Sequence, residues 1–219
     1  MKKFEHELES LMQRVMQMGE AAESMVASAS SALAERDFAM IQAVRDIEPT
    51  LDRFQVELDG EAIRLMTVYS PIAKDLRFLL MVTRIVSELE RIGDQALNNV
   101  QSVEAMRAEP RPPDKVLADL TRMSDITRTM LRDALRAFDT EDIERAQQVL
   151  KADDEVDRLN AETFRDLLTD KTVTHEVLNQ YLHLILVARS VERIADHATN
   201  ICEEVIYVVK GEDIRHQTE

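Results

Sequence analysis

Apolar residues recur at intervals of three and four along most of the chain, which is the spacing that places side chains on one face of an α-helix. The first such run covers residues 4–34. Its stripe consists of Phe4, Leu8, Leu11, Val15, Met18, Ala22, Met25, Ala29 and Leu33. This pattern predicts a long helix that buries one side against a core. We interpret the methionines of this run as flexible filler of that core.

A second run predicts a helix that has Asp37 as its N-cap and ends near Tyr69. Pro49 lies inside this run. Because proline lacks a backbone N–H and its ring clashes with the preceding turn, we expect a kink or a brief interruption there. Ser70 and Pro71 then open a third helix, with Ser70 as N-cap and Pro71 at the first helical position.

The third helix is expected to end near residue 107, where a proline-rich segment begins. Residues 108–114 contain three prolines within four positions, which favours a stiff, extended linker. The helical pattern then starts again. It predicts helices over residues 117–138, over residues 142–168 and, after a turn at residues 169–174, up to about Lys210, where Gly211 is a stop signal.

The two halves of the chain repeat each other. With an offset of 105 residues, the matched positions are Met25 and Met130, Ala29 and Ala134, Leu33 and Phe138, Asp37 and Asp142, and Asp52-Arg53 and Asp157-Arg158. With an offset of 102 residues, they are Glu90 and Glu192, and Asp94 and Asp196. The change of offset falls between the second and third helices of each copy, where a loop tolerates a change of length.

This duplication predicts an all-α fold. We expect six long helices as two pseudo-symmetric antiparallel three-helix bundles, because short loops place successive helices side by side. The scarcity of helix breakers, 4 glycines and 5 prolines in 219 residues, favours long helices. The predicted division is into a first bundle, a linker, a second bundle and a polar tail, at residues 1–108, 109–114, 115–211 and 212–219.

The net charge of −15 narrows the classes of partner. Such a surface repels nucleic acids and anionic membranes, so we expect metal ions or basic protein surfaces instead. Cys202 is the only cysteine, which excludes an intrachain disulfide and fits a reducing compartment. We see no secretory signal after Met1 and no apolar run of about 18 residues, so we expect a cytoplasmic protein without membrane insertion.

Four acidic pairs share the form acid-x-x-x-Asp, two in each half of the chain: Glu48 and Asp52, Glu90 and Asp94, Asp153 and Asp157, and Glu192 and Asp196. On a helix, residues four apart lie one turn apart on the same side. In each half, the two pairs are equally far from the turn between their helices, by about 20 residues or roughly 30 Å. In an antiparallel hairpin they lie at the same height, and we expect them to face each other across one groove.

Four carboxylates held close together repel one another unless they are protonated or bridged by a cation. Ligation by oxygen alone suits Mg²⁺, Ca²⁺, Mn²⁺ or a ferric centre. Asn98 and Asn200 continue these strips one turn further, and they either add a carbonyl oxygen or form local hydrogen bonds. The alternative is a solvated acidic face, in which neighbouring arginines form salt bridges with the pairs: Arg53, Arg91, Arg158 and Arg193.

Other chemistry has weaker support in the sequence. We interpret His197 as a surface or packing histidine, because it points about 100° away from its neighbour Asp196 on a helix. We interpret Cys202 as a structural thiol, since no histidine at helical spacing lies beside it. A metal-dependent enzyme and a helical scaffold without functional metal stay open as alternatives, although the pairs lack a nearby general base.

Two segments, Leu89–Asp94 and Val191–His197, resemble the signature segments of the PhoU family of phosphate-transport-system regulatory proteins. Residues 71–77 resemble the segment that opens that family's third helix, and the likeness extends over residues 4–211. The resemblance implies two three-helix bundles with metal ions at Glu/Asp-x-x-x-Asp motifs on their surface, in some members as multinuclear clusters. Those motifs fall on the eight carboxylates named above, with iron, zinc, magnesium or manganese as the expected ions.

The resemblance also implies a function without catalysis. Members of this family are cytoplasmic and link the high-affinity phosphate transporter to a membrane sensor kinase, which holds the phosphate-starvation response off when phosphate is plentiful. We therefore expect a negative regulator of phosphate uptake and phosphate-starvation signalling. Its expected partners are the phosphate ABC transporter ATPase, a sensor histidine kinase and a second copy in a homodimer.

The sequence departs from the family pattern in two places. Pro49 lies between Glu48 and Asp52, and a kink there would displace one carboxylate of the first half. In the second half, valines stand at the positions of Pro71 and Asp75. The residues of the helix-opening segment therefore carry over to the first half only.

Overall fold

The structure is a computed structural model that describes residues 2–170, 174 and 177–211. This part of the chain forms six α-helices and no β-strand. The helices are α1 (Lys2–Ala34), α2 (Ala39–Tyr69), α3 (Ala73–Ala105), α4 (Asp114–Thr140), α5 (Ile143–Thr169) and α6 (Leu178–Lys210). The predicted all-α class with six long helices is confirmed. None of the described helices combines the length and the apolar character needed to cross a membrane.

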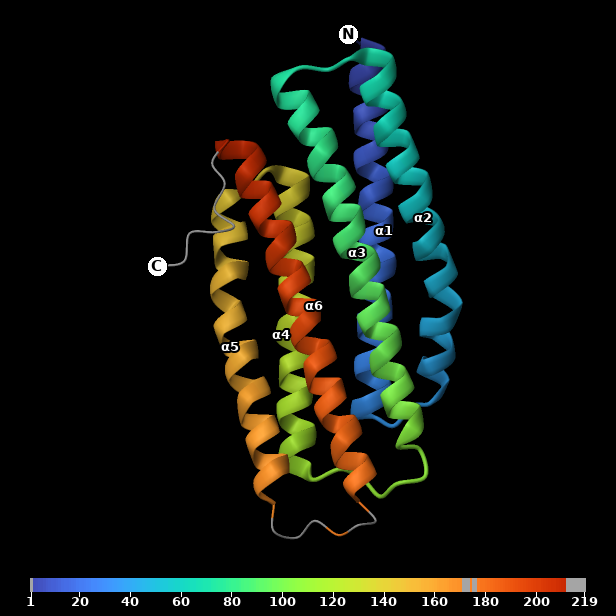
Figure 1. Cartoon of the computed structure of the whole chain (residues 1–219), viewed down its shortest axis with the longest axis vertical. Coiled ribbons are helices and arrows are strands. Elements are labelled where there is room, and N and C mark those ends of the chain that lie inside the picture. Colours follow the sequence, from blue (N-terminus) through green and yellow to red (C-terminus); the bar gives the residue numbers. More distant parts are fainter. Residues whose placement is uncertain (1, 171–173, 175–176, 212–219) are drawn as a thin grey trace.

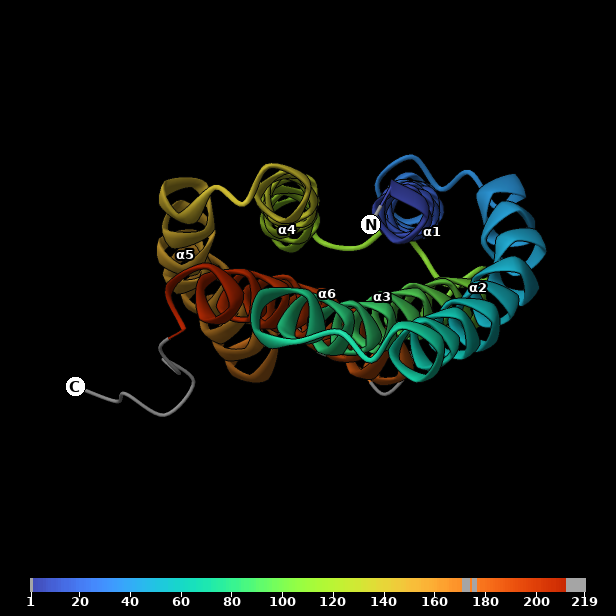
Figure 2. The same ribbon diagram turned by 90° about the horizontal axis from the view of Figure 1, so that it is seen from above.

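The helices form two bundles that share one core. All six run roughly along the long axis of the molecule, and neighbours in sequence run antiparallel (Figure 1). Helix α1 packs against α2 and α3, and α4 packs against α5 and α6. Viewed from above, α3 and α6 lie side by side in the middle, α1 and α4 cover one face, and α2 and α5 lie at the two ends (Figure 2). The contacts of α3 with α6 and of α1 with α4 join the bundles.

The predicted apolar stripes are the buried faces. In α1 the buried members of the predicted stripe are Leu11, Val15, Met18, Ala22, Met25, Ala29 and Leu33. Met18 and Met25 have no exposed surface, which agrees with their interpretation as core filler. Burying one of the leucine, valine or methionine side chains completely stabilises the fold by about 1.5–3 kcal/mol, so the stripe holds α1 against the core.

The start and the middle of α2 differ from the prediction. The N-cap is Phe38 rather than Asp37, whose carboxylate instead accepts a hydrogen bond from the Ala39 N–H at 3.1 Å. Of the two outcomes expected at Pro49, the interruption does not occur, since α2 continues through it as one curved helix (Figure 1). Pro49 is exposed, so the carbonyl of Arg45, which loses its helical partner to the proline, can be hydrated there.

The turn between α2 and α3 also corrects the prediction. Ser70 is the C-cap of α2 in a left-handed conformation, and its N–H donates to the Met66 carbonyl at 3.1 Å. Helix α3 starts only at Ala73, after Ile72 as N-cap, so Pro71 lies in the loop. Proline disfavours a right-handed helical conformation in the residue before it, which ends α2 at this point. The prediction had the correct turn but assigned Ser70 to the wrong helix.

At the other end of the chain, Gly211 ends α6 as predicted. It adopts a left-handed conformation with φ of 74°, and its N–H donates to the Tyr207 carbonyl at 2.8 Å. Most of the turn predicted at residues 169–174 and the tail predicted at residues 212–219 lie outside the described residues.

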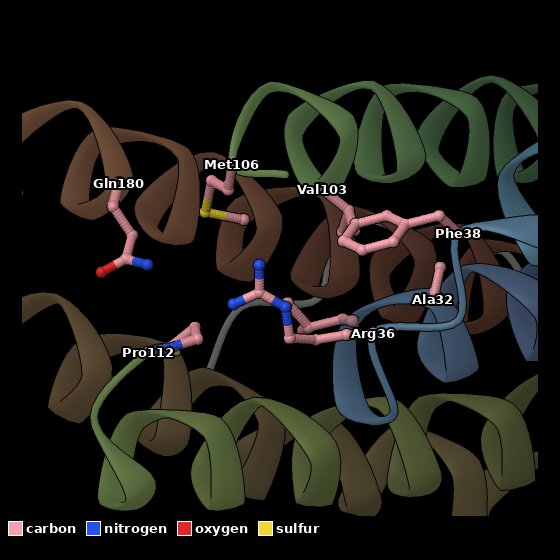
Figure 3. A pocket seen from close by; sticks show the side chains of 8 residues that line it. Ala32, Arg36, Phe38, Val103, Met106, Pro112 and Gln180 are labelled. Atoms are coloured by element: carbon pink, nitrogen blue, oxygen red, sulfur yellow. The ribbon is translucent and has the colours of Figure 1, made fainter. Parts of the chain in front are cut away.

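The linker between the bundles is held by side chains from both of them. Arg36, after α1, donates to the carbonyls of Arg107 and Glu109 at 3.0 and 3.1 Å. Gln180 of α6 donates to the Pro110 carbonyl at 2.5 Å. Figure 3 shows Arg36 at the centre of this contact, with Gln180 on one side and Phe38 on the other. The proline-rich segment is therefore packed against both bundles rather than loosely extended.

Candidate metal centre

The acidic pairs of the second bundle meet across the groove between α5 and α6. Burial, followed by the negative charges of Asp157 and Asp196, raises the pKa of the Asp153 carboxyl to about 7. Asp154 and Glu192 contribute smaller effects of the same sign. Because charge–charge interaction falls with distance, this coupling places the carboxylates of α5 and α6 close together. Carboxylates from both predicted pairs, one on α5 and one on α6, therefore lie near enough to affect the charge of Asp153.

The same group contains a buried oxygen without a partner. Oδ1 of Asp153 is buried and has no hydrogen-bond partner among the described residues. Burial and the charges of Asp196 and Asp157 also raise the pKa of Glu192, and burial and Asp157 raise that of Asp196. A buried polar atom without a partner costs about 1–3 kcal/mol, so this group favours either a proton or a cation.

The first bundle forms a smaller group. Burial, then Asp94 and then Asp52 raise the pKa of Glu90, and burial and Asp52 raise that of Asp94. Asp52 of α2 therefore lies near enough to Glu90 and Asp94 of α3 for its charge to act on both. Glu48 is not among the charges that act on Glu90 or Asp94. Its counterpart Asp153 is the most strongly coupled carboxyl of the second group, so the two grooves are not equivalent.

The salt bridges proposed as an alternative are not formed. Ion pairs are common elsewhere on the surface, but none of the eight carboxylates forms an ion pair or accepts a hydrogen bond within the described residues. Arg91 pairs with Glu88 at 3.1 Å, and Arg53 donates to a threonine hydroxyl at 3.3 Å. Arg158 pairs with Glu155 and Glu162. The carboxylates are left without cationic partners while most of the neighbouring arginines are used elsewhere.

Arg193 is the neighbouring arginine without an ion pair in the described part of the chain. Its charge opposes the burial that raises the pKa of Glu192 and of Asp196, but it does not reach salt-bridge distance. The negative charges of the second acidic group are therefore only weakly offset by nearby positive charges.

The donor set of both groups fits a hard cation. All eight candidate ligands are carboxylates, and oxygen donors suit Mg²⁺, Ca²⁺, Mn²⁺ or ferric iron better than Zn²⁺, which takes nitrogen and sulfur readily. Within the described residues, no three acidic, histidine or cysteine side chains already stand at metal-binding distances. Asp52, Asp94, Asp157 and Asp196 are exposed, so their side chains are free to turn towards an ion.

The two asparagines have different surroundings. Asn200 donates a hydrogen bond to Glu88 Oε2 at 3.0 Å, which is the local alternative that the sequence left open. Asn98 is exposed on α3. His197, interpreted as a surface or packing residue, shares a 2.7 Å hydrogen bond between Nδ1 and Glu88. Burial favours the protonated form of Glu88, but these hydrogen bonds and the charges of His197 and Arg91 outweigh it and lower its pKa.

Sequence reasoning missed the polar contacts between the bundles. Arg84 of α3 donates to both carboxylate oxygens of Glu204 on α6, at 3.0 and 2.8 Å, and the Glu204 side chain is only 7% exposed. One signal was available in the repeat. With the offset of 102 residues, Glu88 corresponds to Ser190 and Glu204 to Ser102, so both glutamates depart from the repeat where the bundles touch.

Cys202 is fully buried, which agrees with the interpretation as a structural thiol. Burial raises the pKa of this thiol well above its usual value, with smaller contributions from Asp133 and Glu203. A thiol that stays protonated is a poor nucleophile and a poor metal ligand.

Comparison with known proteins yields one family. The model of the PhoU domain matches residues 15–103 and 120–205. A phosphate-specific transport system accessory protein PhoU homolog of Caulobacter vibrioides is 37% identical over 216 residues, which cover 99% of this chain and 94% of that protein. The phosphate-specific transport system accessory protein PhoU of Escherichia coli is 32% identical over 213 residues, which cover 97% and 88%.

Solved structures agree in fold. The crystal structure of PhoU from Pseudomonas aeruginosa superposes with a TM-score of 0.92 at 32% identity, covering 95% of this chain and all of that one. The phosphate transport system regulatory protein PhoU from Streptococcus pneumoniae superposes with a TM-score of 0.88 at 23% identity, covering 96% and 99%. The helices and their arrangement are therefore shared across these proteins.

Proposed function

The chain belongs to the PhoU family, and on that premise we propose that it is a metal-binding regulatory adaptor of a phosphate transport system. It binds cations at the two acidic groups and contacts the transporter ATPase and a sensor histidine kinase in the cytoplasm. Through these contacts it lowers phosphate uptake and phosphate-starvation signalling. The names of the relatives support this role, since they are accessory proteins of a phosphate-specific transport system.

One observation carries the metal-binding part of the proposal. Eight carboxylates at the predicted positions form no ion pair within the described residues, and one of them has a buried oxygen without a partner. A bound cation would neutralise the repulsion within each group. It would also tie α2 to α3 and α5 to α6, because each group draws carboxylates from both helices. Asp52, Glu90 and Asp94 would hold it in the first bundle, and all four carboxylates in the second.

The surface supports a role in protein contacts. Large apolar side chains are exposed at the α2–α3 end of one bundle and near the α5–α6 end of the other: Val56, Ile63, Val68, Ile72, Leu76 and Leu80, and Phe164, Leu168, Leu178, Leu182 and Leu186. Exposed apolar groups surrounded by polar surface are typical of protein interfaces. The proposed homodimer and the two protein partners have these surfaces available, and basic partner regions would match the charge of −15.

The metal-binding part is tested by measuring metal content. We expect E192A/D196A to lose the ions of the second group, because it removes both α6 ligands. The matched control is E5A/E9A, an exposed acidic pair of the same spacing on α1. Elemental analysis of the purified proteins after loading should show less metal in E192A/D196A only. Equal content in all three proteins would remove Glu192 and Asp196 from the ligands, and a wild type without metal would favour a solvated acidic face.

The adaptor part is tested by a pull-down with the transporter ATPase and the sensor kinase of the same organism. We expect both to be retained by the wild-type protein loaded with metal. Retention of neither would contradict the adaptor role, whatever the metal content.

A further inference from the structure

Helices α3 and α6 meet along an antiparallel contact that we call the seam. It is formed by residues 84–102 of α3 and residues 183–204 of α6. The two helices are copies of each other with an offset of 102 residues. The seam therefore has two halves related by a pseudo-two-fold axis, and each contact in one half has a counterpart in the other.

The first half of the seam is closed by charged side chains. Arg84 pairs with Glu204, and Glu88 accepts hydrogen bonds from His197 and Asn200 and pairs with Arg91. Both glutamates have little exposed surface, with 7% of the Glu204 side chain and 13% of the Glu88 side chain exposed. Two carboxylates therefore neutralise the guanidinium groups of this half.

The second half of the seam lacks both carboxylates. Ser190 stands where the first half has Glu88, and Ser102 stands where it has Glu204. Leu186 stands where the first half has Arg84, so one arginine is lost together with its carboxylate. Arg193 matches Arg91, and Arg189 stands where the first half has Ser87, so the second half still carries two arginines. A pocket of about 440 Å³ occupies this half, lined by Gln95, Asn98, Gln101 and Ser102 of α3 and by His183, Leu186, Arg189, Ser190 and Arg193 of α6.

The groups that line this pocket have unused hydrogen-bonding capacity. Neither Arg189 nor Arg193 forms an ion pair within the described residues, and no carboxylate lines the pocket. Nδ1 of His183 is buried without a hydrogen-bond partner in the same part of the chain. Glu192 lies close enough to Arg189 and Arg193, and Asp196 to Arg193, for the arginine charges to affect the pKa of these carboxyls, yet none of them forms an ion pair within the described residues. The pocket thus presents two guanidinium groups without a paired anion.

This chemistry selects the ligand class. Guanidinium groups donate pairs of parallel hydrogen bonds to phosphate and carboxylate oxygens, and amide and hydroxyl groups add single donors. The volume falls within the range of small-molecule sites. No phenylalanine, tyrosine or tryptophan lines the pocket, so it lacks the large aromatic surface on which a nucleobase stacks. We propose that this pocket binds a small phosphate-type oxyanion, either free or as a small organic phosphate ester.

A bound oxyanion would neutralise the arginines of the second half, as the carboxylates of Glu88 and Glu204 neutralise those of the first half. It would accept hydrogen bonds from α6 through its arginines and from α3 through Gln95, Asn98 and Gln101, and so link the two bundles. The seam would then be closed in both halves only when the ligand is present. This inference goes beyond the adaptor role, and it depends on neither the metal ions nor the protein partners.

The test is a calorimetric titration of protein stripped of metal by chelation, at about 0.15 M salt to screen non-specific binding. The ligands are inorganic phosphate, pyrophosphate and glycerol 3-phosphate, with citrate as a carboxylate of comparable size. We expect saturable binding of at least one phosphate ligand, and tighter than that of citrate. The phosphate ligand that binds most tightly distinguishes the free anion from an ester. No binding of any phosphate at millimolar concentration, or tighter binding of citrate, would overturn the proposal.

Three variants locate the site. R189Q/R193Q should weaken binding by about tenfold or more, because it removes the charged donors. R136Q/R165Q makes the same change of charge at exposed arginines of α4 and α5 and should leave the affinity unchanged. S190E copies Glu88 into the second half and should abolish binding by pairing with Arg193. Circular dichroism shows whether each variant is folded. Equal weakening in R136Q/R165Q, or unchanged binding in folded S190E, would contradict this location.

Because the protein is free of metal, the result is independent of the metal centre. Loss of metal in E192A/D196A with no phosphate binding would support the proposed function and overturn the pocket. Phosphate binding together with unchanged metal content in E192A/D196A would support the pocket and would remove Glu192 and Asp196 from the proposed metal ligands.

Discussion

At the scale of single residues, Asp153 is the carboxyl whose surroundings most oppose its charge. Burial, followed by the charges of Asp157 and Asp196, raises its pKa from 3.8 to about 7. The folded protein therefore binds more protons than the unfolded chain between these two values. Stability must fall as the pH rises through this range, because protons favour the state that binds them more tightly. Above about pH 7 the Asp153 carboxylate is ionised in the folded state, and the folded state then carries the full free-energy cost of this buried charge unless a cation replaces the proton.

We predict that D153N stabilises the metal-free protein at pH 7.5. The amide cannot ionise, so the cost of a buried charge disappears. An increase of about 1 kcal/mol in the free energy of unfolding would raise Tm by about 2–4 °C for a chain of this size. The gain should vanish near pH 4, where the wild-type carboxyl is protonated in the folded state. Thermal unfolding followed by circular dichroism across this pH range measures both effects.

The control for this prediction is D139N, which changes an exposed aspartate of α4. Its Tm should follow that of the wild type at every pH. If D153N lowers Tm at pH 7.5 in metal-free buffer, the carboxyl does not carry the cost assigned to it.

At the scale of helices, the contact between α2 and α3 and its counterpart between α5 and α6 are filled by side chains of different size. Gly93 of α3 stands against Leu51 of α2, whose side chain occupies the space that a Cβ atom at Gly93 would need. The counterparts in the second bundle are Ala195 and Val156, both buried. A smaller residue on one helix accompanies a larger residue on the other, so the total volume is nearly conserved. Gly93 lies inside the acidic motif for this reason of packing.

We predict that G93A destabilises the protein although alanine favours helices. Overpacking costs about 1–3 kcal/mol. The higher helix propensity of alanine than of glycine offsets about 0.8–1 kcal/mol of this destabilisation. The double variant L51V/G93A reproduces the arrangement of the second bundle and should recover most of the lost stability. Urea unfolding of the single and double variants measures this coupling, and additive effects would contradict it.

Gly60 provides the matched control for the packing argument. It lies in the interior of α2, and nothing surrounds the position that a Cβ atom would take. G60A should therefore stabilise the protein by about 0.5–1 kcal/mol in the same urea experiment. A similar loss in G60A and G93A would mean that overlap with Leu51 is not the cause.

At the scale of the whole molecule, the seam decides whether the bundles behave as one body. The Arg84–Glu204 pair lies within it, and the Glu204 side chain is nearly buried. Removing one partner of such a pair leaves a charge with little access to water. The proline-rich linker lies at the opposite end of the α3–α6 contact from this pair, where Arg36 and Gln180 hold it. Loosening the seam should therefore expose the linker.

We predict that R84M destabilises the protein by about 1–3 kcal/mol, less than for a fully buried pair because Arg84 is 45% exposed. It should also accelerate proteolysis within residues 106–113. The control is R122M, since Arg122 pairs with Glu155 on the surface, where an ion pair contributes about 0–1 kcal/mol. Urea unfolding and limited proteolysis of both variants measure the difference. Equal effects would mean that the pair does not hold the bundles together.

The sequence by itself determined the helices and their order, and it placed the acidic motifs on neighbouring helices. These properties depend on local spacing: the helical period selects the buried face, and equal distance from a turn places two motifs at the same height. Gly211 was predictable for the same reason, because a glycine in the left-handed conformation ends a helix locally. The caps near Asp37 and Ser70 were displaced by one or a few residues, since several adjacent residues can end or begin a helix there.

Only the tertiary structure decided which partner each charged side chain takes. Arg91 adjoins Glu90 in sequence, yet it pairs with Glu88, which His197 and Asn200 of a distant helix hold in place. Likewise, the pairing of Arg84 with Glu204 depends on how two copies of one helix cross. A long side chain reaches many neighbours, and burial and competing charges from other helices select among them. The spacing of residues along one helix does not contain that information.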